Sequence, residues 1–289
     1  MRSRRALLYV PADDLHKINK AANLSVDSII LDLEDATATN RKQEARQISA
    51  NVLQTIQFGD SERLVRVNPF FSGLTEADLE AILPAKPDGI ILPKVINAAD
   101  VQTLSSIIQS AEQKNGWQIG SIPIIAVVES ALGIIQLPQI CQADARLQAI
   151  ICGGEDLAAD LNAIRTRSAK ELFYARSAVV LHAAAYKLQA IDMVTADFTD
   201  LDFLVEEARS GMEMGFSGKQ IIHPNQVEPV QKAFTPEEDE IRYAQELIRQ
   251  FNENQSNGQG AFAIDGAMVD MPMITRAKNL LARANITTE

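Results

Sequence analysis

The chain has 289 residues, a net charge of −11 at pH 7, and 46% hydrophobic and 22% charged residues. This composition is typical of a soluble globular protein with enough apolar residues for a large core. The acidic balance argues against a general nucleic-acid binder, which needs a basic face. No apolar run approaches the ~20 residues that span a membrane. We therefore expect neither nucleic acid nor a membrane as a partner.

The cysteine content and the N-terminal residues bear on the cellular compartment of the protein. Cys141 and Cys152 are too few for a disulfide framework or a zinc site. The N-terminal residues MRSRRALLYVP pass directly from basic residues into an apparent strand, without the apolar region and cleavage site of a signal peptide. We expect a reducing, cytoplasmic location, and an organellar mature form stays open.

Short β-rich runs recur along the chain, and each is followed by a helical pattern such as EADLEAILPA, AADVQTLSSIIQSAEQ or KELFYARSAVVLHAAAYK. The runs are nearly continuous in Ile, Val and Leu, as expected for parallel strands that are covered on both faces. In chain order they are LLYVPA (7–12), SIILDLED (28–35), RLVRVNP (63–69), GIILPKV (89–95), IPIIAVVES (122–130), LQAIICGGED (147–156), QAIDMV (189–194) and KQIIHP (219–224).

Eight strands alternating with helices predict an α/β fold, a (β/α)₈ TIM barrel, over residues 1–230. In that fold the active site lies at the C-terminal ends of the strands. Ionisable or amide side chains gather there, whereas the strand bodies almost lack them. These side chains are Asp32, Glu34, Asp35, Arg66, Asn68, Lys94, Glu129, Glu155, Asp156 and His223.

The pattern changes after residue 230. A helix is predicted from TPEEDEIRYAQELIRQFNEN, with Thr235 as N-cap and Pro236 at the first helical position. The polar stretch 252–260 is predicted as a loop, and MPMITRAKNLLARA as a last amphipathic helix. Residues 231–289 are surplus to the barrel and form a C-terminal helical extension, which could be a lid, a swapped arm or plain packing.

The stretch CGGEDL ends one apolar strand with adjacent carboxylates, Glu155 and Asp156. Such a pair favours a helix N-terminus as readily as an ion site. The preceding strand ends in Glu129, within AVVESA, so two neighbouring strands bring Glu129 and Asp156 within reach of one ion. Few hard oxygen ligands suit Mg²⁺, with water and substrate in the other positions. We predict a divalent-metal site.

Further polar strand ends surround this pair. Asp32, Glu34 and Asp35 in DLEDAT, like Glu155, are suited to holding metal waters or Arg66 around the site, although part of DLEDAT also suits a helix start. Arg66 in RVNP either forms a buried ion pair or grips a substrate carboxylate. Lys94 in LPK suits a structural counter-charge, and His223 in IIHPNQ is either a satisfied structural histidine or a ligand.

The ordered motifs LLYVPADD, LDLEDAT, RVN, LPK, AVVESA and CGGEDL resemble the citrate lyase β-subunit and malyl-CoA lyase group of CoA-thioester carbon–carbon lyases, within the HpcH/HpaI aldolase superfamily. In the C-terminal half, KELFYARSAVV, LQAIDMV, GFSGKQIIHPNQ and GAFAIDGAMVDMP are similar to the citrate lyase β-like proteins that act as citramalyl-CoA lyases. The match covers almost the whole chain. Two small departures are Ala12 and Ser130, where the family usually has glycine and threonine.

The resemblance implies a Mg²⁺-dependent barrel, usually trimeric, with an acyl-CoA as substrate. It implies Glu129 and Asp156 as metal ligands and Arg66 as the group that binds the substrate carboxylate. It also implies Asp270 as the acid–base residue, on a C-terminal segment that reaches a neighbouring subunit. Contacts to the substrate and its CoA arm are implied for Tyr9, Lys17, Lys20, Gln220 and Ile221.

On this basis we expect retro-Claisen cleavage of citramalyl-CoA to pyruvate and acetyl-CoA. Cleavage of L-malyl-CoA, β-methylmalyl-CoA or citryl-CoA is the near alternative, and a pyruvate-type class II aldolase that needs no CoA is a further one. A non-catalytic barrel subunit of a larger complex is the alternative of another class. An assay of metal-dependent keto-acid release distinguishes these possibilities.

Overall fold

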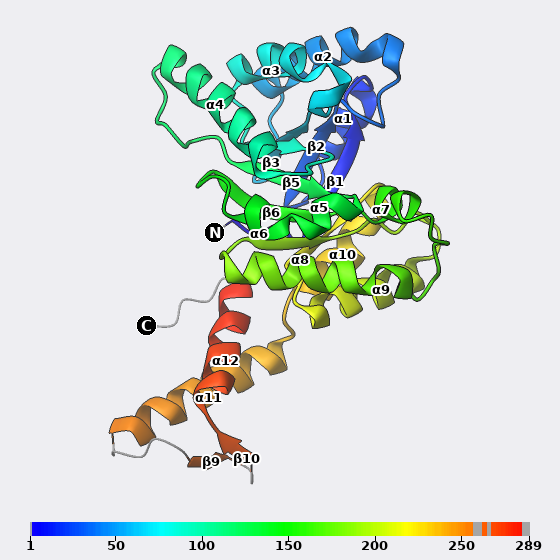
Figure 1. Cartoon of the computed structure of the whole chain (residues 1–289). Coiled ribbons are helices and arrows are strands. Elements are labelled where there is room, and N and C mark those ends of the chain that lie inside the picture. Colours follow the sequence, from blue (N-terminus) through cyan, green and yellow to red (C-terminus); the bar gives the residue numbers. More distant parts are fainter. Residues whose placement is uncertain (1, 257–261, 265–266, 285–289) are drawn as a thin grey trace. The chain divides into compact units, whose positions relative to one another are not determined.

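The computed structural model describes residues 2–256, 262–264 and 267–284 of the chain (Figure 1). By their internal contacts the residues divide into two compact units, Arg2–Gln231 and Lys232–Glu289, and each is considered by itself. Within the described ranges, no helix combines the length and the apolar character needed to cross a membrane.

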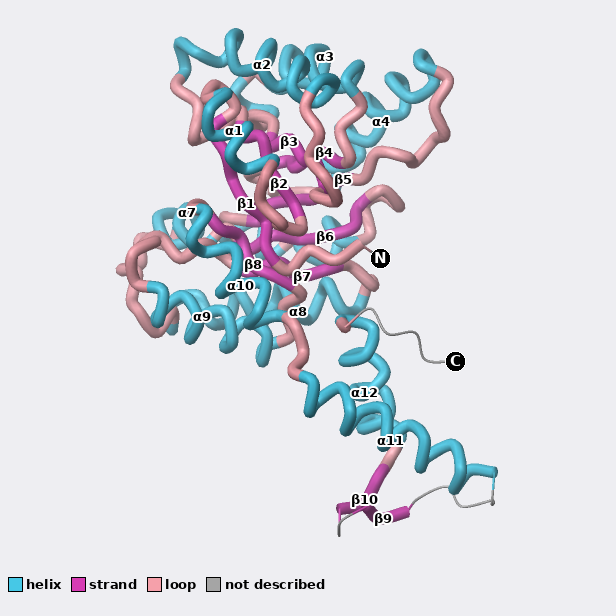
Figure 2. Tube along the Cα trace, turned by 180° about the vertical axis from the view of Figure 1, so that it is seen from behind, coloured by secondary structure: helices cyan, strands magenta, loops and turns pink. Residues whose placement is uncertain are grey.

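The first unit is a closed barrel of parallel strands in the order β1 to β8, with β8 paired to β1. The tube view shows these strands surrounded by the helices of the unit (Figure 2). The strands are β1 (Ala6–Pro11), β2 (Ser28–Asp32), β3 (Glu62–Arg66), β4 (Gly89–Leu92), β5 (Ile124–Val128), β6 (Leu147–Cys152), β7 (Gln189–Asp192) and β8 (Gly218–Ile221). The predicted fold is confirmed. The predicted runs continue past the strand ends, into the turns that carry the polar side chains.

Several helices of the barrel unit, α1, α4, α5 and α9, begin after a residue whose side chain caps the helix. Helix α4, for example, starts after Asn97, which forms a capping box with Asp100, and ends at Gly116, whose φ is 68°. The α-helices are α1 (Leu15–Ala22), α2 (Lys42–Thr55), α3 (Thr75–Ile82), α4 (Ala98–Asn115), α5 (Ala131–Ile135), α6 (Leu137–Cys141), α7 (Gly154–Asp160), α8 (Phe173–Ala185), α9 (Leu201–Met214) and α10 (Val227–Phe234). Short 3₁₀ turns are η1 (Thr39–Arg41), η2 (Phe70–Ser72), η3 (Leu83–Ala85), η4 (Lys170–Leu172) and η5 (Pro224–Gln226).

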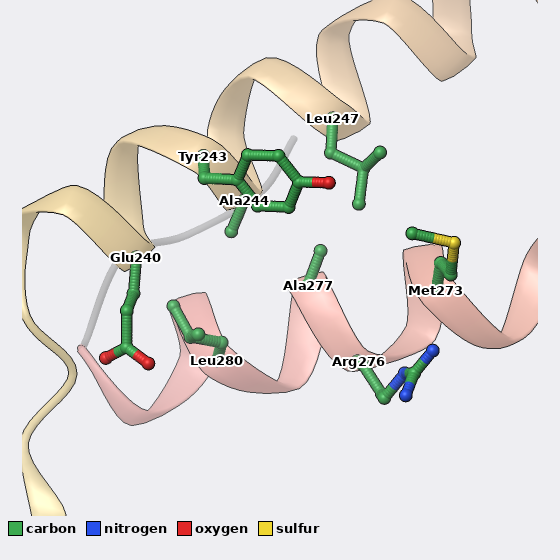
Figure 3. Close-up of a pocket in the computed structure, with 8 residues that line it drawn as sticks. All are labelled: Glu240, Tyr243, Ala244, Leu247, Met273, Arg276, Ala277 and Leu280. Atoms are coloured by element: carbon green, nitrogen blue, oxygen red, sulfur yellow. The ribbon is translucent and has the colours of Figure 1, made fainter. Parts of the chain in front are cut away.

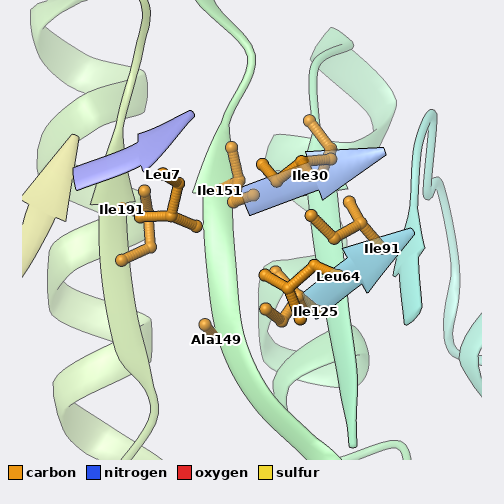
Figure 4. Packing of buried hydrophobic residues seen from close by; sticks show 9 residues of the cluster. Leu7, Ile30, Leu64, Ile91, Ile125, Ala149, Ile151 and Ile191 are labelled. Atoms are coloured by element: carbon orange, nitrogen blue, oxygen red, sulfur yellow. The ribbon is translucent and has the colours of Figure 1, made fainter. Parts of the chain in front are cut away.

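The interior of the barrel is filled by aliphatic side chains from nearly every strand (Figure 4). They are Leu7, Ile30, Leu64, Ile91, Ile125, Val127, Ala149, Ile151 and Ile191. Burying each larger side chain contributes roughly 1.5–3 kcal/mol relative to leaving it exposed. Because this interior is a packed core and not a pore, polar chemistry is confined to the ends of the strands.

The N-terminal end of the barrel is filled by a buried polar cluster around Arg4, which is only 1% exposed. Its Nε and Nη2 donate to the two carboxylate oxygens of Glu62 at 2.8 and 2.7 Å. Nη1 and Nη2 also donate to the side chains of Gln189 and Gln148, at 2.7 and 2.8 Å. Ser28 Oγ donates to Glu62 as well, at 2.9 Å. This end is therefore committed to structure, and the opposite end is left for function.

The second unit consists of α11 (Glu238–Ser256), a hairpin of β9 (Phe262–Ile264) and β10 (Ala267–Val269), and α12 (Met271–Arg283). Helix α11 continues to Ser256, so the predicted loop is wrong for residues 252–256, and residues 257–260 lie outside the described range. The polar residues there continue the exposed face of an amphipathic helix, which sequence pattern alone does not separate from a loop. The hairpin is a further element that the sequence did not indicate.

The two long helices of this unit pack through an apolar seam that includes Leu247, Phe251, Ile274 and Leu281. Beside the seam lies an apolar pocket of about 250 Å³ (Figure 3). Its walls come from both helices and include Tyr243, Leu247, Met273 and Leu280, with Glu240 and Arg276. Two helices alone thus leave part of their apolar surface open.

Candidate active site

Five consecutive strands bring charged side chains to one end of the barrel. Asp32 ends β2 and Arg66 ends β3, while Lys94 and Glu129 follow β4 and β5. Asp156 lies in the first turn of α7, directly after β6. Because the strands are parallel and adjacent in the barrel, their C-terminal ends lie side by side. Residues far apart in the chain therefore meet at this end.

Arg66 is held in place by carboxylates. Its Nε and Nη2 donate to the two oxygens of Asp32 at 2.7 and 2.6 Å, and its Nη1 lies 2.8 Å from Glu34 Oε2. The guanidinium also lies over the ring of Tyr9, at 4.7 Å. Burial opposes the charge, but Asp32 above all raises the pKa of Arg66 well above its ordinary value. Asp32 uses two of five guanidinium N–H groups, so others remain for a bound carboxylate.

Lys94 stands between the arginine and the metal-site carboxylates. Its Nζ lies 2.8 Å from Glu34 Oε1 and 3.7 Å from Asp156 Oδ2. Its backbone N–H donates to Glu129 Oε1 at 2.8 Å. Burial lowers the pKa of the ammonium group, but the bond to Glu34 outweighs this effect and the pKa is raised. The lysine is therefore a fixed positive charge at the site.

Glu129 is nearly inaccessible, with 6% of its surface exposed. Burial, followed by the negative charges of Glu34 and Asp156, raises the pKa of Glu129 to about 8. Such a shift means that the carboxylates are crowded in a region of low polarity. A cation placed against Glu129 and Asp156 would relieve this repulsion.

The turn after β6 is shaped for Glu129. A Cβ atom on Gly153 would lie 2.4 Å from Glu129 Cβ and 2.5 Å from its Oε2, so no larger residue leaves room for that side chain. Of the adjacent pair, Asp156 reaches Lys94, whereas Glu155 pairs with Arg165 at 2.9 Å. The two carboxylates of CGGED therefore have different surroundings, and Glu155 is turned to a neighbouring loop.

The donor set suits Mg²⁺. This ion is typically bound through one or two protein carboxylates and keeps water or substrate in its other positions. In the described part of the chain, no group of three or more His, Cys, Asp or Glu side chains is arranged to hold a metal ion. A closed site made of protein ligands alone is thus not formed there, whereas Glu129 and Asp156 match the sparser requirement of Mg²⁺.

Comparison with known proteins places this geometry in a family. The sequence profile of the HpcH/HpaI aldolase/citrate lyase family matches residues 5–224, which include every strand of the barrel and the whole charged cluster. The chain belongs to this family. The resemblance drawn from the ordered motifs is therefore confirmed.

Individual family members agree over nearly the full length. The mitochondrial citramalyl-CoA lyase of Rattus norvegicus is 40% identical over 296 aligned positions, covering 99% of this chain and 87% of the rat protein. The citrate lyase subunit beta of Leuconostoc mesenteroides subsp. cremoris is 36% identical, covering 98% of this chain and 94% of that protein.

A solved structure of the family is also similar. The protein CitE from Mycobacterium tuberculosis, in complex with magnesium, acetoacetate and coenzyme A, has a TM-score of 0.80 and 31% sequence identity. The alignment covers 99% of this chain and 100% of the CitE chain. The similarity thus extends over both compact units.

Three of the residues expected to contact the substrate in this HpcH/HpaI family chain are Tyr9, Gln220 and Ile221. Tyr9 Oη donates to Gln220 Oε1 at 2.9 Å, next to Arg66, and burial raises the pKa of the Tyr9 phenol. Gln220 Nε2 is itself fixed by the backbone carbonyls of Cys152 and Asp192. The side chain of Ile221 is fully buried, so only its backbone could reach a ligand.

The remaining predicted residues are Lys17 and Lys20 of the barrel unit and Asp270 of the second unit. Lys17 and Lys20 are exposed on α1, where Lys17 Nζ is 3.2 Å from Asp14. Asp270 belongs to the second unit and caps α12, accepting the backbone N–H of Met273 at 3.1 Å. The roles of these three residues in binding and catalysis stay predictions.

A supporting network behind the site was missed from the sequence. Lys42 Nζ donates to the carbonyls of Leu33 and Glu34, each at 2.6 Å, and to Asn68 Oδ1 at 2.9 Å. Asn68 in turn donates through its backbone N–H and side chain to Asp78, at 2.7 Å each. Lys42 opens a mixed-polarity helix and looks like a surface lysine in sequence. Only its burial reveals that it fixes the loop carrying Glu34.

The surroundings of His223 fit a structural role. It is the N-cap of η5, and its Nδ1 lies 2.6 Å from Asn225 Oδ1. Its ring stacks on Phe198 with centroids 4.8 Å apart. These contacts account for the histidine without a ligand.

Proposed function

We propose that the chain is a Mg²⁺-dependent carbon–carbon lyase that cleaves citramalyl-CoA to pyruvate and acetyl-CoA. The observation that carries the proposal is the site itself. A permanently charged arginine, Arg66, lies in one cluster with the carboxylates of Glu129 and Asp156 at the catalytic end of a family barrel. Such a site suits a small hydroxy acid, whose carboxylate and hydroxyl oxygens are adjacent. The name of the rat relative, citramalyl-CoA lyase, supports the choice of substrate.

The reaction is a retro-Claisen cleavage that balances without a further reactant. The tertiary hydroxyl of the substrate loses its proton, and its oxygen forms the carbonyl of pyruvate. The bond to the neighbouring CH₂ carbon breaks, and the electron pair passes to the thioester as an enolate. A proton then adds to that carbon and gives acetyl-CoA. Catalysis must therefore remove one proton, stabilise negative charge and return one proton.

The residues divide these tasks. Arg66 would bind the substrate carboxylate with the N–H groups that Asp32 leaves free. Glu129 and Asp156 would hold Mg²⁺, which when bound supplies a Lewis acid that polarises the substrate oxygens and offsets charge. Tyr9, next to Arg66, would contact the thioester, and Lys17 and Lys20 the phosphates of CoA. Asp270 would move the proton, a contribution of typically about 10²–10⁴-fold.

We propose a homotrimer in which Asp270 completes the site of a neighbouring subunit. Asp270 caps a helix of the second compact unit, and the barrel unit contains Arg66, Glu129 and Asp156. Mixing subunits tests the arrangement. Asp270→Asn and Asp156→Asn chains, each inactive alone, should recover part of the activity when they are unfolded and refolded together. No recovery from a verified mixed oligomer would refute sharing of the site, and light scattering gives the subunit count.

A direct assay tests the activity. The native chain is incubated with citramalyl-CoA, L-malyl-CoA, β-methylmalyl-CoA and citryl-CoA, with Mg²⁺ or with a chelator, and keto-acid release is followed. We expect the highest kcat/KM for citramalyl-CoA and loss of activity with the chelator. Preference for citryl-CoA would support the function in the name of the Leuconostoc relative instead. No metal-dependent cleavage of any ester would refute the lyase. The cytoplasmic location stays a prediction, since the rat relative is mitochondrial.

A further inference from the structure

The position of Lys94 indicates how the site accommodates several carboxylates close together. We propose that the ammonium group of Lys94 is a built-in counter-cation, which balances Glu34 and Asp156 in the metal-free protein and competes with a divalent ion for Asp156. The inference rests on the proposed metal site. In it Lys94 is a positioning residue, since it acts through the carboxylates.

The balance of charges at the site requires such a group. Five carboxyl groups meet here, those of Asp32, Glu34, Asp35, Glu129 and Asp156. Arg66 and Lys94 form ion pairs with four of them, and Glu129 accepts the backbone N–H of Lys94. Like charges this close destabilise each other unless a cation lies between them.

Arg66 cannot take over the role of Lys94. Its guanidinium is committed to both oxygens of Asp32 and to Glu34. Among the ion pairs of the described residues, Lys94 supplies the cation within 4 Å of Asp156, at 3.7 Å. The lysine therefore stands where the arginine does not reach, on the side of the metal ligands.

The backbone conformation of Lys94 lets this one residue contact two carboxylates. Its φ is 54°, in the left-handed region that glycine adopts without strain and other L-residues avoid. In this conformation the N–H of Lys94 points to Glu129 while its ammonium group reaches Glu34 at 2.8 Å. Strained backbone of this kind persists where surrounding contacts hold it, often at functional sites. One residue thus touches both proposed metal ligands, one through its backbone and one through its side chain.

A divalent ion would change the partners of Lys94. The ion competes for Asp156, whose pair with Lys94 is the long one, while the 2.8 Å bond to Glu34 remains. The lysine then lowers affinity for the metal and in exchange stabilises the metal-free site. Removing the ammonium group should therefore strengthen metal binding and destabilise the metal-free protein.

Metal affinity and metal-free stability of lysine variants test the inference on the full chain. Lys94→Met removes the charge, and Lys94→Gly also relieves the backbone. Lys187→Met is the matched control, because Lys187 is exposed, has a φ of 59°, and forms no ion pair within the described structure. Mn²⁺ binding is measured by electron paramagnetic resonance and calorimetry without substrate. Thermal unfolding is recorded with and without Mg²⁺.

We expect Lys94→Met and Lys94→Gly to bind Mn²⁺ about tenfold more tightly than the native chain, because a nearby unit positive charge is removed. Both should unfold at a lower temperature without metal, and Mg²⁺ should raise their Tm more than it raises that of the native chain. Lys187→Met should match the native chain in both measurements. Unchanged or weaker Mn²⁺ binding by the Lys94 variants would overturn the inference. A native chain that binds no Mn²⁺ or Mg²⁺ would overturn the proposed metal site as well.

Discussion

Gly153→Ala tests the geometry of the site without removing any chemical group. The added Cβ would lie 2.4 Å from Glu129 Cβ, 2.5 Å from Oε2 and 3.2 Å from Cδ. Carbon atoms in contact are normally about 3.5–4.0 Å apart, so Glu129 or the turn must move by about 1 Å. The backbone itself accepts alanine, since φ at Gly153 is −90°. The substitution thus acts through the position of Glu129.

A displacement of about 1 Å in a catalytic group can reduce the rate by about 10²-fold. We expect kcat/KM for citramalyl-CoA to fall by about this factor and Mn²⁺ to bind more weakly. Overpacking should cost roughly 1–3 kcal/mol of unfolding free energy, which leaves the barrel folded. Steady-state kinetics, calorimetry with Mn²⁺ and thermal unfolding measure the three effects.

Gly89→Ala provides the matched control. A Cβ there would lie 2.8 Å from Leu64 Cδ2, so the barrel is again overpacked, but at the beginning of β4 and away from the carboxylates. This variant should lose stability and keep the native affinity for Mn²⁺. The reasoning is refuted if Gly153→Ala keeps native kinetics and metal affinity, or if Gly89→Ala loses metal binding to the same degree.

Three further predictions concern single carboxylates. Asp156→Asn should weaken Mn²⁺ binding and lower kcat/KM by about 10²-fold or more. Glu155→Gln, which breaks only the pair with Arg165, should change either quantity by less than threefold, about 0.6 kcal/mol. Equal effects of the two substitutions in a metal titration would contradict the assignment. Asp270→Asn should reduce turnover by about 10²–10⁴-fold and leave Mn²⁺ and CoA-ester binding nearly intact, and a matching loss of binding would argue against its acid–base role. Burial acts against the charge of Glu112, but the pair with Arg146 lowers its pKa to about 2, so its stabilising effect is present above the unfolded pKa near 4.5 and is lost as pH falls toward 2. Glu112→Gln should therefore cost about 3 kcal/mol in urea unfolding at pH 7 and progressively less below pH 4.5, and a pH-independent difference would refute this account.

The barrel could be predicted from the sequence because its signals are local. Strands buried on both faces need uninterrupted apolar runs, and runs such as SIILD and IIAVV are hardly interrupted at all. Sequential strands also pair with each other, so the strand order follows the chain order. The polar residue that ends each run marks the C-terminal end of a strand, and Arg66 and Glu129 both lie at this end of the barrel.

The contacts within the site could not be predicted in the same way, because they depend on packing between distant segments. Glu34 was expected to hold metal waters or Arg66, and it does pair with Arg66, but its second partner, Lys94, was not identified from the sequence. Nothing in the local sequence distinguishes Lys42, which is buried beneath this loop, from an exposed lysine at a helix start. The left-handed backbone at Lys94 is equally invisible, since lysine has no preference for that conformation.

The polar cluster around Arg4 has a consequence for the order of folding during synthesis. Arg4 is synthesised well before its partners, since its hydrogen bonds reach residues 144 and 185 positions later in the chain. At translation rates of about 5–20 residues per second, the more distant partner follows on the order of 10–40 s after Arg4. Until then the guanidinium of Arg4 lacks its hydrogen bond to Gln189, and β1 lacks β8, the strand that pairs with it on the side opposite β2. The barrel can therefore close only when almost the whole unit has been made, and Arg4 reaches its full set of native contacts late in synthesis.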